Sequence, residues 1–317
     1  MYYPFIRGKQ FELLMLREMA PQIARWGFVP IIEPVKGNFP ALKRSLEALA
    51  GNRCKFILIA NPSVGELKND SSLLRSEIFD GQLRDYNNYS VGLNLTASDT
   101  LKTARDFFVQ YPKPIAVIHY GFSDGKGLSS LILEKTPMIT NHIFVEQHST
   151  TLYRKHFKVA GVNRVLVQDG FVSRNNREYP PFEPFSELYL TYREMGCDAF
   201  GDFLIVGSDF KEGGGPAYAI AIHLTYADPD SDDAIAIKHY VSDQVDTPKD
   251  PAGKFLEALQ KLSEDVLAPS SLIFQSDAVR EYLTLYENQH FPGLGYTKKL
   301  SMQHHFELMA HLLNVEV

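Results

Sequence analysis

Eight short apolar runs restrict the fold of this chain more than any other feature of its sequence. Most are nearly continuous runs of Val, Ile, Leu and Phe, bounded by turn residues, and they do not alternate with polar residues. Strands that are buried on both faces have this composition, and such strands occur mainly in parallel sheets. The runs cover residues 3–6, 29–35, 56–60, 91–95, 115–120, 143–146, 165–167 and 203–206.

Helical patterns lie between these runs. Leu13, Leu16 and Ile23 fall on one helical face, and residues 40–51 start with a proline and end with a glycine, as a helix often does. The regular alternation of strand and helix predicts an α/β fold, a (β/α)8 TIM-like barrel, whose usual size is about 250 residues. An open doubly wound sheet is the alternative, although no G-x-G-x-x-G follows an early strand.

The remaining residues predict two additions to this barrel. Residues 217–227 and 234–241 alternate with period two around the acidic stretch DPDSDD, which indicates a β-hairpin insertion after strand 8 at about 213–243. Helical segments then predict a C-terminal extension at about 270–317. Because no low-complexity linker separates these parts, we expect a single barrel domain over residues 1–317.

Composition excludes several classes of protein. The net charge of −6 gives no electrostatic basis for non-specific binding to nucleic acid. Cys54 and Cys197 are far apart and lack metal-ligand spacing, so we expect two reduced thiols. No apolar run has transmembrane length, and no secretory leader is recognisable. We therefore expect a soluble cytoplasmic protein with no membrane partner.

The ends of the predicted strands supply candidate catalytic residues, because TIM-barrel active sites lie at the carboxyl ends of the strands. Neighbouring carboxylates raise one another's pKa, so that a general acid and a general base can coexist. The same oxygens could hold a divalent metal ion, with His119 and His148 available for a softer one. The predicted catalytic residues are Glu33, His119, Glu146, Asp169 and Asp209.

Other polar residues at the same ends are candidates for binding substrate, and a phosphorylated small molecule is the ligand they suggest. Glycines let backbone N–H groups approach a phosphate, and a lysine adds positive charge. The loops SDFKEGGG and SDGKG combine these residue types. The predicted substrate-binding residues are Arg7, Asn61, Asn94, Lys211, Gly213 and Gly214.

Each of these residues also has a structural interpretation. Glu33 could form a salt bridge with Arg7, and Asp169 before a glycine could form an Asx-turn. The three glycines at 213–215 could be a flexible entry to the hairpin.

Four stretches carry a resemblance to a known family. They are MYYPFIRGKQFELLMLRE, IIEPVK, GGGPAYAIAIHLTY and HFPGLGYTKKLSMQHH. Together they resemble the bacterial family named after the beta protein of bacteriophage T4, along nearly the whole chain. The resemblance implies a bacterial or prophage setting and supplies no catalytic residues.

Two functions follow from these observations. The first is a hydrolase that acts on a phosphorylated or nucleotide-like substrate through the clustered carboxylates, with a divalent metal ion as the candidate cofactor. The alternative is a non-catalytic interaction protein or ligand sensor, which works in phage conflict with a protein partner bound through the hairpin.

Overall fold

The structure is a computed structural model that describes residues 1–315. Contacts divide the chain into two compact units. The barrel unit comprises Met1–Asp169 and Leu188–Phe203, and the second unit comprises Gly170–Glu187 and the residues from Leu204 onward. The single-domain organisation stays a prediction.

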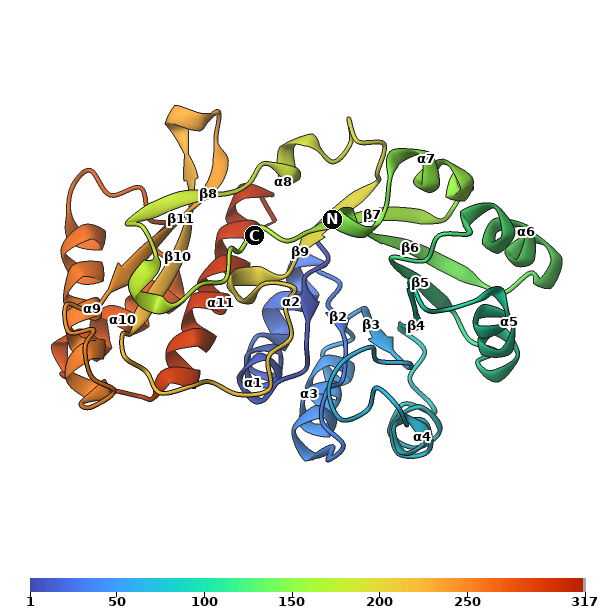
Figure 1. Cartoon of the computed structure of the whole chain (residues 1–317), viewed down its shortest axis with the longest axis horizontal. Helices are drawn as coiled ribbons and strands as arrows, with labels where there is room; N and C mark the ends of the chain where they lie inside the picture. The colour runs from blue at the N-terminus through green and yellow to red at the C-terminus, as the bar shows by residue number, and fades with distance from the viewer. Residues whose placement is uncertain (316–317) are drawn as a thin grey trace. The chain divides into compact units, whose positions relative to one another are not determined.

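The barrel unit contains eight parallel strands that pair in a continuous order (Figure 1). A parallel bridge between Tyr2 and Phe200 joins the last strand to the first, and the Tyr3 N–H donates to the Phe200 carbonyl at 2.9 Å. The predicted TIM-like (β/α)8 barrel is therefore confirmed. The strands are β1 (Phe5–Ile6), β2 (Ile31–Ile32), β3 (Phe56–Ile59), β4 (Tyr89–Thr96), β5 (Ile115–Tyr120), β6 (Ile139–Val145), β7 (Asn163–Gln168) and β9 (Ala199–Asp202).

Helices connect these strands, and sequence signals mark where several of them begin. Pro40 occupies the first turn of α3, and the Asp124 carboxylate caps α6 by accepting from the Gly127 N–H at 2.8 Å. The helices are α1 (Gln10–Glu18), α2 (Ala20–Trp26), α3 (Pro40–Gly51), α4 (Ser72–Leu74), the π-helix η1 (Arg75–Gln82), α5 (Leu101–Gln110), α6 (Gly125–Lys135), the 3-10 helix η2 (Glu146–His148), α7 (Thr151–Arg154), the 3-10 helix η3 (Lys155–Phe157) and α8 (Leu188–Thr191).

The interior of the barrel is filled by side chains. Residues of seven of the strands, such as Phe5, Ile31, Ile57 and Ile118, form one buried cluster. Strand β4 contributes a glycine to this layer, and a Cβ at Gly92 would lie 2.9 Å from Cγ1 of Ile59. The barrel thus has a packed core, as is usual for this fold.

The position of the eighth strand differs from the prediction. The run at 203–206 forms the 3-10 helix η5 (Leu204–Val206), and the strand is β9, which ends at Asp202. Leu204 has a φ of 52°, a left-handed conformation that cannot continue a strand. Gly201 is required in the strand because a Cβ there would overlap the Tyr3 carbonyl oxygen. A short, glycine-containing strand followed by an apolar turn explains the error.

The second unit contains a three-stranded antiparallel sheet in the order β10-β11-β8. The predicted hairpin is confirmed as β10 (Ala221–Asp228) and β11 (Ala234–Val241), joined by the 3-10 helix η6 (Pro229–Ser231). The edge strand β8 (Phe182–Ser186) was not predicted, since Pro184 interrupts its pattern. The predicted helical extension is also present, and it follows a first helix, α9 (Pro251–Leu267), as α10 (Asp277–Glu287) and α11 (Leu294–Leu312).

Candidate functional site

The side chains at the carboxyl end of the barrel divide according to the strand face that they occupy. Successive residues of a strand point to opposite faces. Because Ile118 lies in the interior cluster, Tyr120 faces inward and His119 faces outward. The same alternation places Arg7 and Glu33 on the inward face, two residues beyond Phe5 and Ile31. His119 therefore does not belong to the barrel mouth.

Arg7 and Glu33 form a buried ion pair in this mouth. The Arg7 Nη1 donates to Glu33 Oε2, and the side chains are only 4% and 0% exposed. The other carboxylate oxygen, Oε1, accepts from the Ser63 N–H at 2.7 Å and from its hydroxyl at 2.9 Å. The predicted salt bridge is present, and both carboxylate oxygens of Glu33 are occupied.

The Arg7 guanidinium fills the centre of the mouth between aromatic rings. Its Cζ lies 5.3 Å from the ring centroid of Phe5, 5.9 Å from that of Tyr120 and 5.6 Å from that of Phe203. Its Nη2 also donates to the Tyr120 hydroxyl at 3.3 Å. Cation–π contacts of this kind add to the ion pair and hold the guanidinium in place.

The two predicted asparagines lie together on adjacent strands. The Asn61 amide donates to the Asn94 carbonyl at 2.7 Å and accepts from the Asn94 N–H at 2.8 Å, so Asn61 braces the β4 backbone. Asn94 is 1% exposed, and neither polar atom of its side chain has a hydrogen-bond partner within residues 1–315. Of this pair, only Asn94 keeps its amide available for another group.

His119 lies on the outer surface of the strands, in a buried aromatic cluster. Its Nδ1 is 2.7 Å from the Tyr153 hydroxyl, and its Nε2 is 3.0 Å from Nδ1 of His142. Its ring also packs against Phe144 and Phe157. Burial, followed by the neighbouring His142, lowers the pKa of His119 well below its ordinary value, so the imidazole is neutral at pH 7. The position indicates a structural role.

Glu146 and Asp169 follow the adjacent strands β6 and β7, and both are partly exposed. Glu146 Oε2 accepts from Nε2 of Gln168 at 3.0 Å, which orients the carboxylate beside the end of β7. These are the two predicted catalytic carboxylates that lie on neighbouring strand ends and remain in reach of solvent.

Four of the predicted residues belong to the second unit, because the eighth strand ends earlier than expected. They are Asp209, Lys211, Gly213 and Gly214. Lys211 donates to the Ser173 hydroxyl at 3.2 Å within that unit. Gly213 has a φ of 132°, which favours glycine, and a Cβ at Gly213 or Gly214 would contact nothing. The open glycine loop agrees with the flexible hairpin entry considered above.

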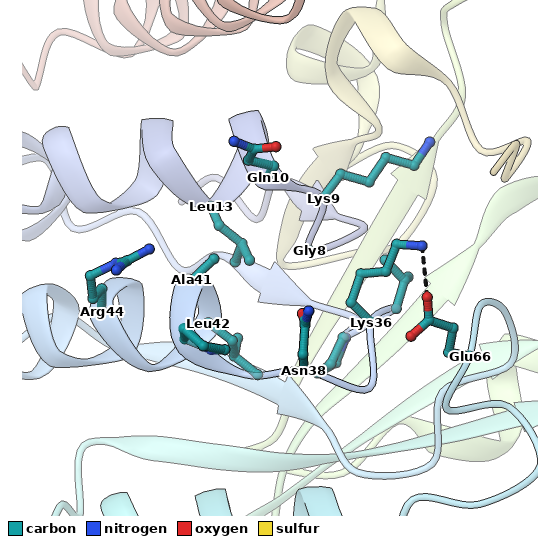
Figure 2. Close-up of a pocket in the computed structure, with 13 residues that line it drawn as sticks. Gly8, Lys9, Gln10, Leu13, Lys36, Asn38, Ala41, Leu42, Arg44 and Glu66 are labelled. Carbon is teal, nitrogen blue, oxygen red and sulfur yellow. Dashed lines mark hydrogen bonds and ion pairs between the residues drawn. The ribbon is translucent and has the colours of Figure 1, made fainter. Parts of the chain in front are cut away.

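A cavity of about 490 Å³ lies beside the barrel mouth, at the loops that follow β1 and β2 (Figure 2). Lys9, Lys36 and Arg44 bring three cationic side chains to its lining, and Glu66 brings the single carboxylate. Lys36 donates to Glu66 at 2.8 Å, and the Gly37 N–H donates to the same carboxylate at 2.8 Å. The excess of positive charge makes the cavity suitable for an anion.

The amino ends of two helices contribute to the same cavity. Lys9 and Gln10 begin α1, where Glu12 in the first turn accepts from the Lys9 N–H. Pro40, Ala41 and Leu42 begin α3, whose first turn contains no acidic residue and whose amino end has no side-chain cap. The free N–H groups and the dipole at a helix amino end attract anions.

Burial lowers the pKa of Lys9, and the nearby Arg7 and Lys36 lower it further, while Glu12 opposes this shift. An anionic ligand would relieve this concentration of positive charge.

The cationic residues of this cavity were missed as a group by the sequence analysis. The prediction considered the residue at which each strand ends. It therefore included Arg7 and Glu33 but not Lys9 and Lys36, which lie two and three residues farther along. The sequence feature that could have revealed Lys9 and Lys36 is the lysine that ends each of the stretches RGK and PVK. Arg44 offered no signal, because it lies inside a helix.

Comparison with known proteins adds nothing to this geometry, since no family model, no curated protein and no solved structure matches the chain. Within residues 1–315, no group of three or more His, Cys, Asp or Glu side chains could hold a metal ion. Among the same residues, no helix is both long enough and apolar enough to cross a membrane.

The buried ion pair predicts a large effect of a conservative change. Glu33→Gln leaves the Arg7 charge buried without its counter-ion, so the free energy of unfolding should fall by about 3–5 kcal/mol. Urea denaturation at pH 7 measures this loss. The matched change Glu77→Gln removes an exposed partner of Lys43 and should leave the denaturation midpoint unchanged. Equal midpoints for the two variants would show that the ion pair is not important for stability.

Buried histidines predict a loss of stability in acid. Burial, followed by the charge of Arg164, lowers the pKa of His142 from 6.5 to about 3. A depressed pKa stabilises the fold above the unfolded pKa, and this contribution disappears as the pH falls toward the folded pKa. Between pH 7 and pH 4, His142 alone should account for about 3 kcal/mol of lost unfolding free energy.

Urea denaturation at several pH values between 7 and 4 tests this expectation. The variant His142→Asn should be less stable at pH 7 and should show a shallower decline with falling pH. A decline as steep as that of the unmodified protein would exclude His142 as its source.

Proposed function

We propose that the barrel unit binds a phosphorylated small molecule in the cavity between the β1 and β2 loops. The observation that carries this proposal is that Lys9, Lys36 and Arg44 all line a space of about 490 Å³, against the single carboxylate of Glu66, and this volume lies within the range of small-molecule sites. Phosphate groups are bound in proteins by such cations together with helix amino ends, and α3 supplies an uncapped one here.

We propose further that the bound molecule is a substrate for hydrolysis. The support is that Glu146 and Asp169 follow adjacent strands at the carboxyl side of the barrel and both remain in reach of solvent. Asp169 lies two residues beyond the inward-facing Val167, whereas Glu146 directly follows the inward-facing Val145 and is oriented by Gln168. One carboxyl group of such a pair can activate water while the other protonates the leaving group. Glu33 is assigned a positioning role instead, because Arg7 and Ser63 occupy its oxygens.

A non-catalytic sensor is the second candidate, and two observations favour it. The centre of the mouth, where TIM-barrel chemistry usually takes place, is filled by the Arg7–Glu33 pair. In the second unit, Phe182 on the edge strand β8 is 62% exposed, which suits pairing with a protein partner. The family resemblance supports a bacterial or prophage setting and a role in phage conflict for either candidate. The cytoplasmic location that we propose for both rests on the composition of the sequence.

Binding of inorganic pyrophosphate tests the proposed anion site. Calorimetric titration should detect binding to the full-length protein, and the affinity should fall as salt concentration rises. Lys36→Met or Arg44→Met should weaken binding about three- to tenfold, since each removes a charge contact of roughly 0.7–1.4 kcal/mol. The control Lys102→Met removes an exposed lysine on α5 and should bind like the unmodified protein. Equal losses in control and cavity variants would contradict the proposal.

Release of inorganic phosphate tests the proposed reaction. A panel of nucleotides and sugar phosphates should contain at least one compound that the protein hydrolyses. Glu146→Gln and Asp169→Asn should each lower the rate at least a hundredfold, which is the usual contribution of a general acid or base, while pyrophosphate binding stays unchanged. Unchanged turnover in both variants would exclude these roles, and binding without turnover of any compound would favour the sensor.

A further inference from the structure

A second cavity, of about 420 Å³, lies in the barrel unit at the loops that follow β5 and β6. It is separate from the cationic cavity and includes the SDGKG loop at residues 123–127. Four of its eleven lining residues carry aromatic or imidazole rings, and the lining also has one lysine and one carboxylate. The lining residues that matter for its chemistry are Phe122, Asp124, Lys126, His148, Tyr153 and His156.

The walls of this cavity present flat rings. The His148 imidazole is stacked on the Tyr120 ring, with centroids 4.7 Å apart and planes at 29°. Since Tyr120 covers one face of this imidazole, the opposite face is the one that a ligand ring could cover. Tyr153 and the buried Phe122 form further aromatic surface. Planar ligands bind such surfaces by stacking, and the interaction is available to every nucleobase.

The cavity also offers hydrogen bonds of both kinds. Within residues 1–315, the ring nitrogens of His148 and His156 have no hydrogen-bond partners, and a neutral imidazole presents one donor and one acceptor. Lys126 adds donors at the rim. Asp124 is less available, because its Oδ1 accepts from the Gly127 N–H. Paired donors and acceptors around a flat surface match the edge of a nucleobase.

Contacts between Tyr153 and the strands stabilise the shape of this cavity. The Tyr153 hydroxyl is 2.7 Å from Nδ1 of His119, which anchors the ring to the strands. Gly125 allows this ring to approach, since a Cβ there would lie 2.8 Å from Cδ2 of Tyr153 and 3.2 Å from Cδ2 of His156. A pocket that is formed before binding avoids the entropic cost of ordering its side chains.

Both cavities open at the carboxyl ends of the strands, and a chain of contacts connects them. Arg7 immediately precedes Gly8 and Lys9, which line the first cavity, and it donates to Tyr120, which stacks on His148 of the second cavity. The strand order places β5 and β6 across the barrel from β1 and β2. The contact between Arg7 and Tyr120 therefore connects the linings of the two cavities.

We propose that the cavity at the β5 and β6 loops binds the base of a nucleotide, and that the ligand of the barrel unit is a nucleoside polyphosphate. The placement of its phosphates rests on the function proposed above, whereas the base site rests on the second cavity alone. His148 acts as the stacking platform, and Gly125 maintains the space for the base.

Calorimetric titration of the full-length protein with ADP, adenosine and pyrophosphate tests this proposal. ADP should bind at least tenfold more tightly than pyrophosphate. His148→Ala should weaken ADP binding about tenfold and leave pyrophosphate binding unchanged. His148→Phe retains a flat ring and should keep most of the ADP affinity, and the exposed control His290→Ala should bind ADP normally. Melting temperatures verify that each variant is folded.

The outcomes separate the two proposals. Equal affinities for ADP and pyrophosphate, or equal losses of both in His148→Ala, would overturn the base site. Binding of adenosine that His148→Ala abolishes would support the base site even if pyrophosphate fails to bind, which would overturn only the phosphate site. Gly125→Ala gives a second check, since it should weaken binding of ADP and adenosine and leave pyrophosphate binding unchanged.

Discussion

Closure of the barrel depends on a short contact between the first and last strands. The Tyr3 N–H bonds to the Phe200 carbonyl, and Gly201 lets the two backbones approach where any side chain would collide with the Tyr3 carbonyl. This pairing makes the sheet continuous, so that all eight strands direct their carboxyl ends to one rim. The mouth and both cavities exist because residues separated by much of the chain meet at that rim.

Closure of the barrel also determines the environment of the Arg7 side chain. Its guanidinium lies between the rings of Phe5, Tyr120 and Phe203 and pairs with Glu33, so residues from both ends of the barrel sequence surround one charge. Removing such a charge from water is expensive, and the ion pair and ring contacts offset this cost. The two cavities lie away from this filled centre, at the loops that follow β1 and β2 and those that follow β5 and β6.

The two cavities differ in the chemistry they offer. The first has excess positive charge and helix amino ends, which suit a phosphate, and the second has flat rings and imidazole nitrogens, which suit a base. Arg7 and Tyr120 connect them without being freely accessible. This arrangement places both cavities on the βα loops and the buried, paired side chains at the strand ends, a division that is common in barrels.

Part of the site could be predicted from the sequence. We predicted that the polar residues at the strand ends line the barrel mouth. Arg7 and Glu33 do lie there, and Glu146 and Asp169 follow adjacent strands. The prediction was wrong for His119, because one residue of register decides which face of a strand a side chain occupies. It also assigned Asp209 to a strand end, because the apolar residues after β9 resemble a strand more than β9 does.

The sequence by itself determined the repeated alternation of strand and helix, the parallel arrangement, the barrel and the hairpin, because burial on both faces requires nearly continuous apolar runs and each connection is local. Only the tertiary structure decided which polar side chains face inward and which loops enclose a cavity. Those features depend on strand register and on contacts such as Arg7 with Tyr120, and they arise only when distant segments pack together.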